Sequence, residues 1–267
     1  MKEDAYLQEH RIEHNLFIEW MKWLQVNHPE HGFTYDGIVS PKDWNEAPKR
    51  ILLLLKDYNQ KSKEKPFIEL NLDDEKDRAT FPNVRSHILW GIKSHDQWRT
   101  WDNAARWVYG LMHLTPDYYP SFSEADQQGD ARHRSNNLKK VAVIDVKKKP
   151  GRSSCSISQL NKYFQKYPES YSFLAREISL YGKLDFVICC GDGLFDIFKI
   201  IAKQEALKSQ IFPSVYEDKD YMICLNGTIV INFIHPLFLK KGLHKDKEYK
   251  RLMVIAQKAL SELKNSI

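Results

Sequence analysis

Short apolar runs bounded by polar residues are the feature of this sequence that most constrains its fold. Residues 51–55 are a continuous apolar run that begins after Arg50 and ends before Lys56. Residues 140–146 and 184–190 form two further runs of the same kind. Such runs are typical of strands that are buried on both faces of a sheet. The sequence therefore predicts a sheet with other elements packed on both sides.

A hairpin and several helices complete the predicted pattern. Residues 221–225 and 228–234 flank Asn226-Gly227, a strong two-residue turn signal. Helical periodicity or composition favours helices near residues 4–26, 84–93, 101–114, 158–180, 194–202 and 247–263, and a long loop over 60–80. The alternation of strands and helices predicts a three-layer α/β/α fold around a mostly parallel, four-stranded sheet. We expect a helical extension over residues 1–45 and one α/β domain over residues 46–267.

Composition narrows the class of protein. Of the 267 residues, 42% are hydrophobic and 28% are charged, which predicts a packed core rather than disorder. The longest apolar run is far shorter than a membrane span, and the first residues do not resemble a signal peptide. We therefore expect a cytoplasmic protein that has no contact with membranes.

The cysteines do not predict a metal or redox site. The four cysteines include no C-x-x-C pair, so neither a zinc ribbon nor a redox dithiol is indicated. No metal and no cofactor are expected. The net charge of +5 is compatible with a polyanionic partner without requiring one.

Polar or small residues follow each of the four predicted parallel strands. Asp57 follows the first strand, Asp145 ends the second, Gly191 ends the third, and His235 follows the last. Ligands of open α/β sheets bind outside the carboxyl ends of the strands, so these residues are predicted to share one crevice. A structural reading is open for each: Asp57 can cap a turn, and His235 can be a structural histidine at a strand end.

Taken in chain order, four segments resemble the motifs of the uracil-DNA glycosylase superfamily. They are residues 56–60, 145–152, 187–191 and 235–238, and the similarity extends roughly over residues 50–239. The resemblance implies the three-layer fold of that family and hydrolysis of the N-glycosidic bond of a base flipped out of DNA. The cysteines that hold an iron–sulfur cluster in some branches of the family are absent from these segments.

The resemblance also implies roles for individual residues. Asp57 would handle the attacking water, and His235 would stabilise the departing base. Asp145 stands where the family has an asparagine that reads the base edge; an ionised carboxylate there prefers bases that offer hydrogen-bond donors. The other expected base-binding residues are Asn59, Trp101 and Phe81. The expected DNA-binding residues are Lys147, Lys148, Lys149, Arg152, Ser153, Leu237 and Phe238.

Two alternatives remain open on the sequence alone. The same fold could be a nucleic-acid-binding module without catalysis, which the replacement of asparagine by Asp145 favours. An α/β enzyme that acts on free nucleotides would also suit Asp57 and the Gly191-Asp192-Gly193 turn. DNA is the expected partner under the leading hypothesis.

Overall fold

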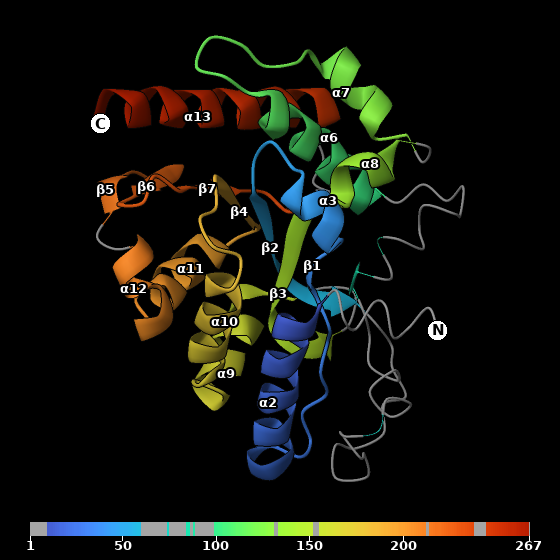
Figure 1. The fold of residues 1–267 in the computed structure, drawn as a ribbon, viewed down its shortest axis with the longest axis vertical. Coiled ribbons are helices and arrows are strands. Elements are labelled where there is room, and N and C mark those ends of the chain that lie inside the picture. The colour runs from blue at the N-terminus through green and yellow to red at the C-terminus, as the bar shows by residue number, and fades with distance from the viewer. Residues whose placement is uncertain are drawn as a thin grey trace.

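A computed structural model of the chain describes residues 10–59, 74, 84, 85, 88, 99–130, 133–151, 155–211, 214–237 and 244–266. Within this part the fold is mixed α/β, with helices on both faces of one sheet (Figure 1). The predicted loop over 60–80 and most of the predicted helix over 84–93 lie outside the described residues. None of the described helices is both long and apolar enough to cross a lipid bilayer.

The described sheet has seven strands in the order β1-β3-β2-β4-β7-β6-β5. Its four central strands, β3, β2, β4 and β7, are parallel to one another. The expectation of four strands in all was too low, because antiparallel strands extend both edges. The bounds are β1 Gly37–Ile38, β2 Ile51–Asn59, β3 Val141–Gly151, β4 Phe186–Cys190, β5 Ser214–Glu217, β6 Tyr221–Cys224 and β7 Ile229–Phe233.

Helices cover the two faces of the sheet in separate groups. One face packs against α2, α9, α10 and α11, and the other packs against α6, α7, α8 and α13 (Figure 1). The bounds are α2 Arg11–Asn27, α3 Pro41–Asn45, α6 Arg99–His113, α7 Phe122–Gln128, α8 Arg134–Leu138, α9 Ile157–Lys166, α10 Ser170–Ser179, α11 Leu194–Ala202, α12 Glu205–Ile211 and α13 Lys245–Ser266.

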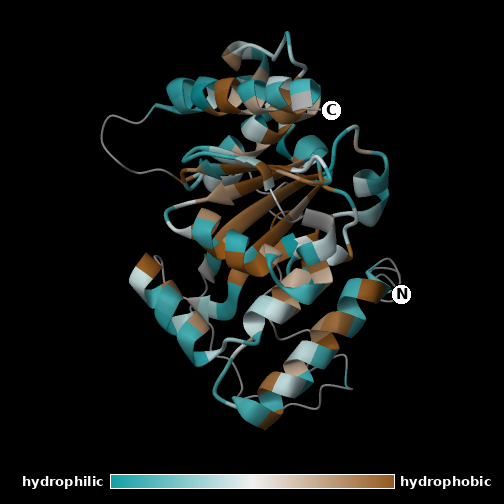
Figure 2. Cartoon of the chain, turned by 90° about the vertical axis from the view of Figure 1, so that its left-hand side faces the viewer, coloured by the Kyte–Doolittle hydropathy of each residue, from teal (hydrophilic) through white to brown (hydrophobic). Residues whose placement is uncertain are grey.

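Strand β2 shows why an unbroken apolar run forms a central strand. Leu52 and Leu54 point into the core cluster that contains α2 and α10. Ile51, Leu53 and Leu55 point into the cluster that contains α6 and α13. Successive side chains of a strand alternate between faces, so a strand covered on both sides needs apolar residues at every position. The strands consequently form a hydrophobic layer between more polar helices (Figure 2).

Residues near the N-terminus belong to this same core. On α2, Phe17, Trp20, Met21 and Leu24 are completely buried. The Trp20 ring stacks on Phe173 of α10 with 4.9 Å between the ring centroids. Strand β1 pairs with β3, so this segment also contributes to the sheet.

Two predicted elements differ locally from those in the structure. The helix expected over 158–180 is two helices, α9 and α10, with Pro168 between them. Proline lacks the backbone N–H that would continue a helix. Strand β3 extends to Gly151 instead of ending at residue 146, so the basic residues 147–149 lie on a strand rather than in a loop. At the predicted hairpin turn, Gly227 has a φ of +83°, which glycine adopts readily.

Candidate functional site

The candidate site lies where the four parallel strands reach their carboxyl ends. Lys56 and Asp57 are in the last part of β2, and Lys147 is opposite Asp57 on β3. Gly191 follows β4, and His235 follows β7 by two residues. Since the strands are parallel, these segments from distant parts of the sequence end at one edge of the sheet. This edge is where open α/β sheets bind ligands.

Asp57 forms a cross-strand ion pair with Lys147. The Lys147 Nζ lies 3.0 Å from the Asp57 Oδ2, and the two side chains are 16% and 7% exposed. Burial raises the pKa of Asp57, while the charges of Lys147 and Lys56 act in the opposite direction. The β2–β3 register shifts just after this pair, between Asp57 and Asn59. Such irregularities often occur beside active sites, where they redirect side chains.

His235 is held as a neutral imidazole with a defined tautomer. Its Nδ1 accepts a hydrogen bond from the backbone N–H of Leu237 at 3.1 Å. Burial, together with the charge of Lys56, lowers the pKa of His235 to about 4. A neutral ring whose Nδ1 accepts must carry its proton on Nε2, so His235 offers an N–H donor at neutral pH. The carbonyl oxygen of Pro236 accepts a 2.7 Å hydrogen bond from Asn103 of α6, which anchors the turn.

Lys56 and His235 both lie next to Gly191, a position whose backbone conformation favours glycine. Gly191 has a φ of +129°, and its N–H donates to the Phe233 carbonyl at 2.7 Å. A Cβ at Gly191 would lie 3.3 Å from the Lys56 Cε and 3.7 Å from the His235 Cβ. The charge of Lys56 acts on both Asp57 and His235; Lys56 lies on the His235 side of the edge, whereas its strand neighbour Asp57 points to the other side. The sequence had placed Lys56 directly after an apolar run and at the start of the segment 56–60, with no functional role of its own.

Asp145 is a buried acid on β3. It lies two residues before Lys147, on the same face of the strand, and it is 1% exposed. Its backbone N–H donates to Asp36 at 2.7 Å, but neither side-chain oxygen has a hydrogen-bond partner among the described residues. Burial, followed by the charge of Asp36, raises the pKa of Asp145 well above its usual value. Burial therefore favours the protonated form of this side chain over the ionised acceptor of the sequence-based expectation.

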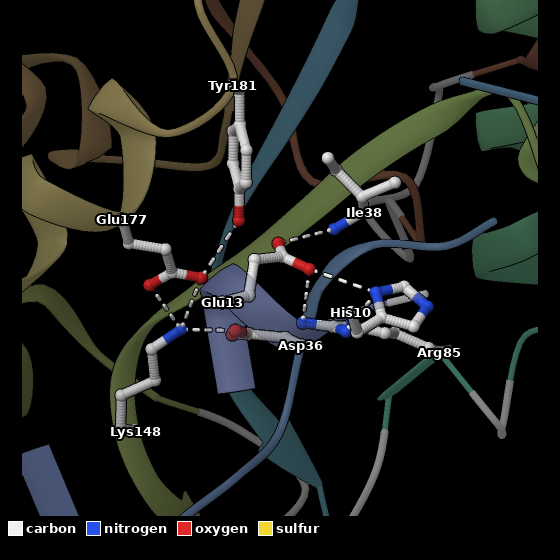
Figure 3. A network of polar contacts seen from close by, with 8 residues as sticks. All are labelled: His10, Glu13, Asp36, Ile38, Arg85, Lys148, Glu177 and Tyr181. Atoms are coloured by element: carbon white, nitrogen blue, oxygen red, sulfur yellow. Dashed lines mark hydrogen bonds and ion pairs between the residues drawn. The ribbon is translucent and has the colours of Figure 1, made fainter. Parts of the chain in front are cut away.

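Lys148 requires a correction, because it does not lie on the surface. Its ammonium group is completely buried and pairs with Asp36 and with Glu177, whose Oε2 lies 2.9 Å away (Figure 3). The neighbouring residues of a strand point to opposite faces, so Lys148 enters the α2 and α10 side of the core while Lys147 does not. The expectation that Lys148 contacts DNA phosphates was wrong.

A second set of charges continues the same buried network. The Glu13 Oε1 accepts the backbone N–H of Ile38 at 3.1 Å, and its Oε2 lies 3.1 Å from Arg85 and 3.0 Å from the Nδ1 of His10 (Figure 3). The hydroxyl of Tyr181 donates to Glu177 at 3.1 Å. These contacts connect α2, β1, β3 and α10, so the network stabilises the fold beneath the candidate site.

The remaining predicted site residues differ in their burial and contacts, and some of them lie outside the described residues. Lys149 donates to the backbone carbonyl of Glu30 at 3.1 Å. Trp101 is 7% exposed and packs in the core cluster that contains α6, which is a structural position. Leu237 is half-buried. Asn59 is at the end of β2, and Phe81, Arg152, Ser153 and Phe238 lie outside the described residues.

Cys155 is a residue near this edge that sequence analysis did not select. Its thiol is half-buried, and burial together with the charge of Asp57 raises the pKa of Cys155.

In the described part of the chain, no group of three or more histidine, cysteine, aspartate or glutamate residues could hold a metal ion. The arrangement at the edge is therefore an acid, an imidazole and two amines, which suits acid–base chemistry and charge stabilisation.

No protein-family model matches the chain, and no curated protein matches it.

Proposed function

We propose that this protein hydrolyses the N-glycosidic bond of a nucleobase, with Asp57 and His235 as catalytic residues. The observation that carries the proposal is their placement: Asp57 and the neutral N–H donor of His235 lie at the carboxyl ends of parallel strands, and the charge of Lys56 acts on both. The order of the sequence motifs supports the same reaction.

The charges at the edge match those that develop when this bond breaks. Cleavage produces positive charge on the sugar and negative charge on the departing base. The Asp57 carboxylate would stabilise the sugar cation, and its Oδ1 would orient the attacking water because Lys147 bonds Oδ2. The Nε2–H of His235 would donate to the departing base, beside the positive charge of Lys56. Prepositioned donors of this kind stabilise developing anions strongly.

Asp145 would recognise the base through its carboxyl group, whose pKa is raised by burial so that the protonated form is favoured. A protonated carboxyl group donates from one oxygen and accepts at the other, as an asparagine amide does through its nitrogen and oxygen. Its unpartnered oxygens would therefore bind a base edge that offers one donor and one acceptor. The protonated form would thereby restore the pairing ability that the replacement of asparagine by aspartate would otherwise remove.

The test is release of a base from single-stranded and duplex oligonucleotides that each contain one modified or mismatched base. Alkaline cleavage at the resulting abasic site reports the product. Asp57→Asn and His235→Asn should each lower the rate by about 100-fold or more, as loss of a transition-state contact does. Asp117→Asn, at an exposed acid outside the site, is the control. Absence of abasic product from every substrate with the wild-type protein would contradict the proposal.

A free nucleotide is a second candidate substrate, favoured by one observation. Lys148 is buried and Lys147 is paired with Asp57, so two of the three expected phosphate-binding lysines are already committed within the protein. The loss of these two lysines from the expected phosphate-binding set favours a substrate with few phosphates. Base release from nucleoside monophosphates, measured by chromatography, would distinguish this candidate from a DNA substrate.

A further inference from the structure

Lys56 is an amine at the candidate site that the proposed hydrolysis does not use as a reactant. In the described part of the chain it forms no hydrogen bond and no ion pair. Its neighbours Lys147 and Lys148 both have carboxylate partners. A lysine amine that no carboxylate holds in place can reach a bound carbonyl carbon, and lysine amines form imines with carbonyl substrates.

We propose that Lys56 forms an imine with the aldehyde of an abasic deoxyribose and that the protein then cleaves the DNA strand at that site. The inference rests on the proposed function, because removal of a base produces this aldehyde. It adds a lyase activity to base release and assigns the nucleophile.

The surroundings of Lys56 suit a covalent intermediate. The missing side chain of Gly191 leaves room for the stem of Lys56, whose Nζ would lie 3.9 Å from a Cβ at that glycine. His235 flanks the same glycine, with its Cβ 3.7 Å from the same point. Consecutive residues of a strand point to opposite faces, so Lys56 and Asp57 flank the sheet edge from two sides. A sugar bound across this edge would have the amine on one side and the carboxylate on the other.

The reaction balances without a cofactor. The neutral Lys56 amine adds to C1′ of the ring-opened sugar, a C–N bond forms, and the two protons of the amine pass to the aldehyde oxygen, which leaves as water. The Asp57 carboxylate then accepts a proton from C2′, the C2′–C3′ double bond forms, and the C3′–O bond breaks to release the 3′ phosphate. Water finally hydrolyses the imine and regenerates the amine.

Reductive trapping on a preformed abasic site tests the inference directly. The protein is mixed with an oligonucleotide that already carries one abasic site, and sodium borohydride reduces any imine to a stable amine. We expect a cross-linked band on a denaturing gel, and peptide mapping should place the DNA on Lys56. Lys56→Arg retains the positive charge but removes the nucleophile, so it should lower trapping at least 10-fold.

The controls separate a chemical role from a structural one. Lys183→Arg, at an exposed lysine just before β4, should trap as the wild type does. Thermal unfolding should show that Lys56→Arg remains folded. Absence of trapping by the wild-type protein, or a cross-link that maps to another residue and persists in Lys56→Arg, would overturn the inference. Because the abasic site is supplied, these outcomes do not depend on whether the protein releases bases.

Discussion

Replacing Lys148 with methionine removes one ammonium group from the interior of the fold and leaves a side chain of similar length. Lys148, Asp36 and Glu177 all have completely buried side chains. Burial opposes the charge on Lys148, but the charges of Asp36 and Glu177 outweigh it and raise the pKa of the lysine. The methionine variant would therefore leave two buried carboxyl groups without their cation.

The expected loss of stability is large. Removal of one partner from a buried ion pair costs about 3–5 kcal/mol, because the remaining charge stays buried. The variant also loses the contacts of the ammonium with the Phe17 and Trp20 rings, at 5.3 and 5.6 Å. Burial raises the pKa of Glu177 well above its usual value, so this carboxyl group can become neutral by taking up a proton. We therefore expect about 3 kcal/mol, the lower end of the range, and a melting temperature lower by roughly 5–10 °C.

Urea denaturation at pH 7 measures this loss. Lys149→Met is the matched control, since Lys149 is the next residue, is only half-buried and donates to a backbone carbonyl. The control should change the free energy of unfolding by less than about 0.5 kcal/mol. A loss below 1 kcal/mol in Lys148→Met, or equal losses in both variants, would refute the assignment of Lys148 to a buried network. A stable Lys148→Met protein with weaker DNA binding would instead restore the sequence-based expectation.

Three further predictions follow from the fold and the site. Gly191→Ala should destabilise by about 1–3 kcal/mol in urea denaturation, because its φ of +129° strains any side chain and a Cβ would crowd Lys56. Between pH 6.5 and 4, His235 takes up a proton in the unfolded chain but not in the folded protein. As the pH is lowered through this range, His235 should therefore decrease the free energy of unfolding by up to about 3 kcal/mol. The His235→Asn variant should lose correspondingly less stability over the same range. Trp20→Ala should cost about 3–5 kcal/mol, since it empties a fully buried position stacked on Phe173, and a melting temperature equal to that of the wild type would contradict the packing.

Much of the fold could be predicted from local sequence. The apolar runs at residues 51–55 and 184–190 are strands because only a strand covered on both faces needs such runs. Asn226-Gly227 is a hairpin turn because glycine reaches the positive φ found there. The edge strands β1 and β5 were missed, since short strands that pair at a sheet edge carry weak local patterns.

The candidate site was predictable only in part. The polar residues after each strand, Asp57 and His235 among them, were visible because the end of an apolar run is local information. The pKa shifts of Asp145 and His235 were not visible, because burial and neighbours from other segments cause them.

The sequence by itself determined the buried strands of this protein and the polar residues that end them, since both follow from which side chains avoid water over a few consecutive positions. Only the tertiary structure decided the partners of each charge. Lys147 and Lys148 are adjacent and identical in chemistry, yet one meets Asp57 at the sheet edge and the other meets Asp36 and Glu177 in the core. The physical reason is the pleat of the strand: neighbouring residues point to opposite faces of the sheet, and segments distant in the sequence provide the side chains that lie on each face.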